Sequence, residues 1–112
     1  MEVCPPGIDV VVAERFGQRL RGLAGLDADD LVPLLLPRCR SIHTFGMRAS
    51  LDVVWLRIDD DERAWVLAVD SDVAPRRLLR APKRGRDVAA LELSAGQAER
   101  LGILPGMELE LG

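Results

Sequence analysis

Short runs of β-branched and other apolar residues recur along the chain, each bounded by turn-forming residues. Runs of roughly four to eight such residues are typical of β-strands. Because Pro33 has no backbone N–H for a neighbouring strand, we expect its strand to be irregular or at an edge of a sheet. The predicted strands are Ile8–Ala13, Leu31–Leu36, Cys39–Phe45, Leu51–Ile58, Arg63–Val69, Val88–Leu93 and Met107–Leu111.

Helical spacing of apolar residues is confined to two short segments. Leu20 and Leu23 recur at helical spacing and predict a helix over Gln18–Leu26, which its glycines weaken. Strands dominate, and they do not alternate with helices as in a parallel α/β fold. The predicted fold class is therefore mainly β: a small single-domain β-sandwich or compact barrel with two short helices and a core over about residues 8–111.

The C-terminal third carries the clearest local signals. Ser94 and Gln97 fit a capping box, in which the serine hydroxyl accepts from the amide of Gln97 and the glutamine side chain reaches back. The helix predicted over Ala95–Leu101 should end at Gly102, because glycine tolerates the left-handed conformation there. Residues 104–107 read Leu-Pro-Gly-Met, which predicts a type II turn.

Length, composition and charge exclude several classes of protein. With 112 residues, 48% of them hydrophobic, the chain can bury a real core and is not disordered. The net charge of −3 argues against a general nucleic-acid or membrane-surface binder. No apolar run approaches the roughly 18 residues of a membrane span, and the start lacks the features of a signal peptide. We expect a cytoplasmic protein in which Cys4 and Cys39 are thiols.

The densest cluster of reactive residue types lies between residues 38 and 55. The spacing of Cys39, His43 and Met47 resembles a copper-ligand loop, but a blue-copper centre needs two histidines and this chain has one. A zinc site would need further ligands from distant segments. On one strand, Cys39 and His43 would lie about 13 Å apart, too far for one ion or for a nucleophile–base pair. We therefore expect no metal and no cofactor.

His43 and Asp52 form the remaining catalytic hypothesis. If their strands are neighbours, the carboxylate would orient the imidazole as a general base, and Arg19 would bind an anionic substrate of a hydrolase- or lyase-like enzyme. In the alternative, Asp52 caps the turn at residues 47–50 and His43 satisfies a buried polar contact. Neither interpretation establishes a catalytic residue.

Glu92 is an acid flanked by two leucines in a predicted strand. Arg19 is its predicted ion-pair partner, because arginine matches carboxylates well. Such a pair is structural unless it lines a cleft together with His43. The candidate ligand-binding residues are Arg19, His43, Phe45, Met47, Asp52 and Glu92.

Residues 73–87 are rich in proline and arginine and predict a long surface loop. Within it, residues 76–86 carry six positive charges and no acid, so the loop could hold an anionic ligand or RNA. It contains no aromatic side chain, which argues against binding of single-stranded nucleic acid by base stacking. The alternative is a solvated loop that balances an otherwise acidic chain.

Five pieces of the sequence, in this order, resemble the ACR family of bacterial and archaeal proteins, known as domain of unknown function 192. They are Arg19–Leu23, Cys39–Arg48, Leu51–Val54, Leu91–Gly96 and Leu101–Gly106. The resemblance implies a mainly β, sandwich-like domain that occurs in secreted and cytoplasmic forms, with no established activity, cofactor or catalytic residue. Ser50 and Ser94 stand where family members often have proline.

These observations favour a non-enzymatic binding or accessory module that presents a polar groove to a protein or a small-molecule ligand. We expect no membrane partner, and the charge argues against nucleic acid. Two alternatives stay open: an enzyme that uses His43 with Asp52, and a binder of anionic ligands or RNA that uses the basic loop.

Overall fold

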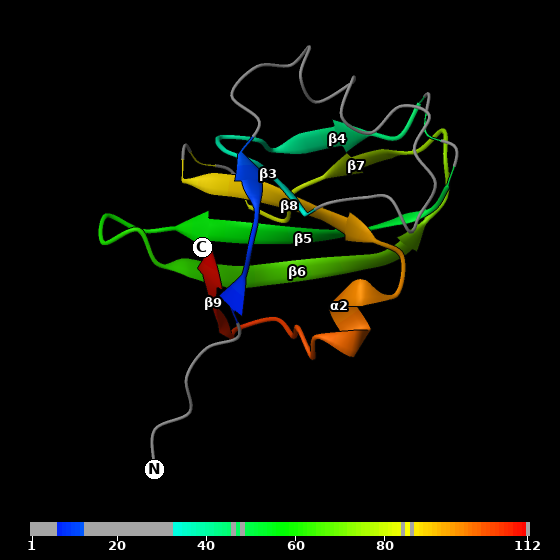
Figure 1. Cartoon of the computed structure of the whole chain (residues 1–112). Helices are drawn as coiled ribbons and strands as arrows, with labels where there is room; N and C mark the ends of the chain where they lie inside the picture. Colours follow the sequence, from blue (N-terminus) through cyan, green and yellow to red (C-terminus); the bar gives the residue numbers. More distant parts are fainter. Residues whose placement is uncertain are drawn as a thin grey trace.

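The computed structural model describes residues 7–12, 33–45, 47, 49–83, 85 and 87–111. Within these ranges the chain is mainly β, as predicted (Figure 1). The helix predicted over 18–26 lies outside them, and no helix within them is long and apolar enough to cross a membrane. The strands are β1 (Gly7–Ile8), β2 (Val11–Val12), β3 (Leu34–Leu36), β4 (Ser41–His43), β5 (Leu51–Ile58), β6 (Ala64–Val73), β7 (Leu78–Arg80), β8 (Val88–Ser94) and β9 (Glu108–Leu111), with the helix α2 (Gln97–Arg100).

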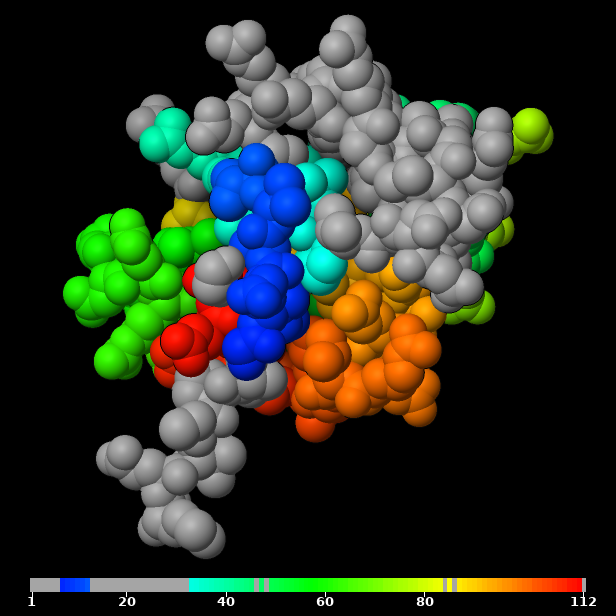
Figure 2. Space-filling model, in the orientation of Figure 1, coloured from blue at the N-terminus to red at the C-terminus, as the bar shows by residue number. Residues whose placement is uncertain are grey.

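A large sheet contains seven strands in the order β1-β9-β6-β5-β8-β3-β2. At its centre, β5 pairs antiparallel with β6 on one side and β8 on the other. The two ends of the order, β1 and β2, belong to one short segment, residues 7–12. The sheet therefore curls until this segment bridges its edges, and Figure 2 shows residues 7–12 in blue between β9 in red and β3 in cyan.

A small sheet, formed by β4 and β7, lies on one face of the large sheet (Figure 1). Its strands are antiparallel, and Ile42 is paired with Leu79. Both side chains point toward the large sheet, where Ile42 is almost fully buried. One face of the small sheet thus covers apolar surface of the large sheet, and its other face points to solvent.

Two hydrophobic cores lie on opposite faces of β5, whose first six residues are all buried. The inner core fills the curl of the large sheet and includes Val54 and Leu56 of β5 and Ala98 of α2. The outer core lies between β5 and the small sheet and includes Val53 and Trp55. Full burial of such a side chain contributes about 1.5–3 kcal/mol. Because both faces are covered, β5 shows an apolar run over residues 53–56 instead of alternation.

Several predictions of strand position are wrong. The strand predicted as irregular or at an edge is β3, which is fully buried and lies between β8 and β2. Pro33 precedes it, and its carbonyl accepts a hydrogen bond from the Val11 amide at 2.9 Å. β4 is shorter than the predicted strand over 39–45, whereas β6 continues beyond the predicted end to Val73. The segment predicted as a loop over 73–87 contains β7.

The predicted start of this helix is also wrong. The N-cap of α2 is Gly96, and not Ser94 as the capping box requires. The reason is that β8 continues through Ser94, which pairs with Leu51 of β5. Ser94 is thus the last residue of a strand, and α2 begins only at Gln97.

The predicted end of the helix is confirmed. Gly102 has a φ of 69°, and its amide donates to the carbonyl of Glu99. The Ile103 amide donates to the carbonyl of Ala98, which completes a Schellman motif. The type II turn over 104–107 is confirmed too, with a φ of 90° at its glycine and a backbone hydrogen bond from its last to its first residue.

Candidate functional site

Asp52 lies on β5 and is 1% exposed. Its Oδ1 accepts a hydrogen bond from the Asp72 amide at 2.9 Å, and its Oδ2 accepts one from the Ala98 amide at 2.9 Å. The Ala98 amide belongs to the first turn of α2, where backbone N–H groups have no partner within the helix. A negative charge is also favourable at a helix N-terminus. Asp52 therefore joins β5, β6 and α2, and its two hydrogen bonds go to these elements and not to a described residue of the turn at 47–50.

The structure does not bring His43 and Asp52 together. Leu51 and Val53 of β5 face the outer core, against which the small sheet packs. Because successive side chains of a strand point to opposite faces, Asp52 faces the inner core with Val54. His43 belongs to the small sheet. The imidazole and the carboxylate thus belong to opposite sides of the large sheet.

The other candidate residues occupy different environments. His43 is half-buried, and its ring centroid lies 5.7 Å from that of Phe45, which is 56% exposed. Met47 packs against the outer core. Glu92 is buried in β8, between β5 and β3. Arg19 lies outside the described residues, so its predicted pair with Glu92 stays a prediction.

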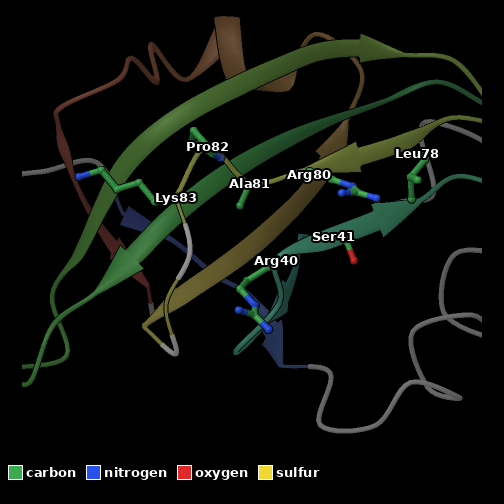
Figure 3. A pocket seen from close by; sticks show the side chains of 7 residues that line it. All are labelled: Arg40, Ser41, Leu78, Arg80, Ala81, Pro82 and Lys83. Carbon is green, nitrogen blue, oxygen red and sulfur yellow. The ribbon is translucent and has the colours of Figure 1, made fainter.

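A pocket of about 470 Å³ lies over the small sheet. We call it the basic pocket, because three of its lining residues are cationic and none is acidic. Figure 3 shows the three cationic side chains spread around the pocket, with Lys83 and Leu78 at opposite ends. Its lining residues are Arg40, Ser41, Leu78, Arg80, Ala81, Pro82 and Lys83.

The two strands of the small sheet place these side chains by alternation. Ser41 is paired with Arg80, and both are exposed on the outward face because Ile42, between Ser41 and His43, points inward. One residue further along, the Ala81 amide donates to the carbonyl of Arg40 at 2.8 Å. The backbone pairing thus holds the basic segments of the two strands side by side.

Thr44 fixes the position of the chain before β7. It is almost fully buried, and its Oγ1 accepts from the Arg77 amide and donates to the Ala74 carbonyl, each at 2.8 Å. Its own amide donates to the Arg77 carbonyl at 2.9 Å, and its carbonyl accepts from the Arg76 amide at 3.2 Å. These bonds attach the segment between β6 and β7 to the end of β4.

Comparison with known proteins identifies the family. The chain matches the family model DUF192, described as "Uncharacterized ACR", over residues 3–111. The chain belongs to the DUF192 family. No curated protein matches it significantly.

Two solved structures resemble this DUF192 protein in fold. A protein of unknown function from Novosphingobium aromaticivorans matches with a TM-score of 0.64 and 23% identity, over 88% of this chain and 71% of that one. A protein from Sinorhizobium meliloti, described as a "putative transcription regulator", matches with a TM-score of 0.66 and 22% identity, over 88% and 77%. At this identity the likeness concerns the fold alone.

The basic pocket of the DUF192 protein contains residues that sequence reasoning missed. Arg40 and Ser41 were not among the candidates, whereas Arg80 and Lys83 were noticed only as part of a charged loop. The available signal was the alternation around Ile42, which places its neighbours on an outward face. The partner strand carried no such signal, because it lies in a segment rich in proline and arginine.

The charges of the basic pocket are not neutralised by the residues that the structure describes. An ion pair appears between Arg63 and Glu108, at 3.9 Å, but no described carboxylate forms one with Arg40, Arg80 or Lys83. Among the same residues, no group of three or more His, Cys, Asp or Glu side chains could hold a metal ion. The arrangement therefore offers cationic hydrogen-bond donors on an open surface.

Proposed function

We propose that this DUF192 protein is a binding module that takes a small anionic ligand in the basic pocket. The observation that carries the proposal is that Arg40, Arg80 and Lys83 all line one pocket that has no acidic residue in its lining. Arginine and lysine bind phosphates and carboxylates through charge-assisted hydrogen bonds, and arginine can do so with two parallel bonds. The Ser41 hydroxyl adds a further donor.

The size of the pocket supports a small ligand. Sites for small molecules commonly enclose about 300–1,000 Å³, and the basic pocket has about 470 Å³. The net charge of the chain is −3, which disfavours a long polyanion that extends beyond the pocket. The spread of the cationic side chains in Figure 3 suits an anion with several charges, such as a chain of phosphates.

The hydrogen bonds that Asp52 makes within the fold argue against the alternative of catalysis by His43 with Asp52. Both carboxylate oxygens accept hydrogen bonds from backbone amides, and the carboxylate lies on the inner side of the large sheet. A general base oriented by Asp52 would require the imidazole to reach that side. The basic pocket, in contrast, is open to solvent without rearrangement of the fold.

Calorimetric titration of the full chain with inorganic tripolyphosphate tests the proposal. We expect the double variant R40Q/R80Q to lose at least about tenfold in affinity, because each arginine contributes a hydrogen bond to a charged group. The matched control is Arg100→Gln, which removes an exposed charge at the end of α2. Absence of binding to the wild type, or an equal loss in the control, would overturn the proposal.

A further inference from the structure

The outward face of the small sheet changes character along its length. One cross-strand pair is Ser41 with Arg80, and the next is His43 with Leu78. Leu78 lines the basic pocket and is 61% exposed. Figure 3 places Leu78 at the opposite end of the pocket from Lys83. The cationic surface thus continues directly into apolar surface.

Phe45 extends this apolar surface. Its side chain is 56% exposed, and its ring contacts the His43 imidazole with a tilt of 45°. The other aromatic side chains in the described part of the chain have partners inside the fold: Trp55 is fully buried, and Trp65 donates to Asp59. An exposed phenylalanine ring is a surface on which a flat ring can stack.

The spacing of the two surfaces sets the length of the ligand. Ser41, the partner of Arg80, lies at the start of β4, whereas Phe45 lies in the turn that follows the end of β4 at His43. Inorganic phosphate at Arg80 cannot reach Phe45. A nucleoside phosphate can, because its sugar and phosphate chain separate the base from the terminal charge.

We infer that the ligand is a nucleoside polyphosphate, with its phosphates against Arg40, Arg80 and Lys83 and its base stacked on Phe45 beside Leu78. The inference rests on the proposed anion site and adds the ring that the ligand must carry. It accounts for an exposed leucine in the lining of the basic pocket and for an exposed aromatic ring beside His43, the residue paired with that leucine.

The test compares ATP with tripolyphosphate, which has the same phosphate chain but no base, in calorimetric titrations without divalent cations. We expect ATP to bind the wild type at least about fivefold more tightly, since stacking of a base on an aromatic side chain has about that effect or more. In Phe45→Ala this advantage should disappear while the affinity for tripolyphosphate stays the same. Phe45→Trp should retain the advantage. The matched control is Leu104→Ala, which removes an exposed apolar side chain outside the pocket lining.

The outcomes separate the inference from the proposed function. Equal affinities for ATP and tripolyphosphate, both lost in R40Q/R80Q, would overturn the inference and leave the proposed function intact. An ATP advantage that survives in Phe45→Ala would also overturn the inference. Binding of neither compound would overturn both. A single-stranded oligonucleotide that binds far more tightly than ATP, with an affinity that falls steeply as the salt concentration rises, would also overturn the inference, because the ligand would then be a nucleic-acid strand.

Discussion

Two polar clusters on opposite sides of β5 differ in how completely their groups are partnered. On the inner side, the Asp52 cluster joins one carboxylate to the amides of Asp72 and Ala98. On the outer side, beyond the small sheet, Arg40 and Arg80 lie in an open pocket whose lining contains no acid. Water cannot solvate a buried carboxylate, so its partners must come from the protein, whereas exposed cations are solvated without them. The Asp52 carboxylate therefore stabilises the fold through its partners, whereas the exposed cations of the basic pocket keep hydrogen-bond donors that a ligand can use.

The largest effect should come from Asp52→Ala, which removes the acceptor of the buried Ala98 amide and of the part-buried Asp72 amide. Such a loss costs about 1–3 kcal/mol for a buried group and less for a part-buried one, so we expect the free energy of unfolding to fall by about 2–4 kcal/mol in urea denaturation. The free energy of unfolding of Asp52→Asn should lie between those of this variant and the wild type, because the asparagine side chain keeps one oxygen acceptor. Asp60→Ala is the matched control, since Asp60 is exposed in the turn after β5, and it should change the free energy by less than about 0.5 kcal/mol. Equal losses of unfolding free energy in the two alanine variants would show that the hydrogen bonds of Asp52 do not stabilise the fold.

A smaller loss is expected from Thr44→Val, which keeps the shape of the side chain but removes its hydroxyl. The Arg77 amide and the Ala74 carbonyl lose this partner, so the free energy of unfolding should fall by about 1–2 kcal/mol. The affinity for tripolyphosphate should fall as well, because Thr44 fixes the segment that leads into β7. Thr44→Ser, which keeps the hydroxyl, should retain most of the affinity. Wild-type affinity in Thr44→Val would show that the basic pocket does not depend on this contact.

The same comparison explains which features could be predicted from the sequence. The limits of β5 were predicted correctly, because its apolar run is followed by a series of acids that form a turn. Gly102 and the type II turn were predicted because the residues that define them are adjacent in the chain. The basic pocket could not be predicted, because it depends on pairing between β4 and β7, whose anchor joins Thr44 to a residue 33 positions away.

Asp52 is a second feature whose role could not be predicted from the sequence. Its place in a strand was predicted, but its partners lie 20 and 46 residues away and are backbone amides, which every sequence position except proline offers. The hypothesis of a pair with His43 assumed that their strands were neighbours. In the structure β4 pairs with β7 in the small sheet, and β5 pairs with β6 and β8. Long-range pairing therefore decided both the candidate site and the role of the buried acid.

Asp59 tests whether burial, and not partnering alone, makes Asp52 important. It is more open to solvent, yet its carboxylate accepts from the Arg63 and Asp61 amides and from Trp65 Nε1. The hydrogen bond from the Arg63 amide, followed by that from Trp65, lowers the pKa of Asp59 below its ordinary value of 3.8. The folded state thus favours the charged carboxylate, so its stabilising effect is complete above that value and is lost as the pH falls through the lowered pKa.

Asp59→Asn should therefore unfold slightly more easily than the wild type near neutral pH, and the difference should shrink as the pH falls from neutral to about 2. We expect the effect near neutral pH to be smaller than that of Thr44→Val. Urea denaturation at the two pH values measures it, and NMR titration of the Asp59 carboxyl measures the pKa directly. A difference that persists unchanged in acid would mean that the amide side chain disturbs the turn for reasons other than charge.

The smallest effect on stability should come from R40Q/R80Q, the same variant that we expect to weaken binding of tripolyphosphate. Without ligand, its free energy of unfolding should lie within about 0.5 kcal/mol of the wild type, as for other exposed substitutions. With tripolyphosphate at about 100 times the dissociation constant, the wild type should gain about 2.7 kcal/mol and the variant much less. Arg63→Gln, which breaks the exposed pair with Glu108, should keep the full gain. A loss of more than about 1 kcal/mol in the unliganded variant would show that the two arginines stabilise the fold, and the distinction between the two clusters would then fail.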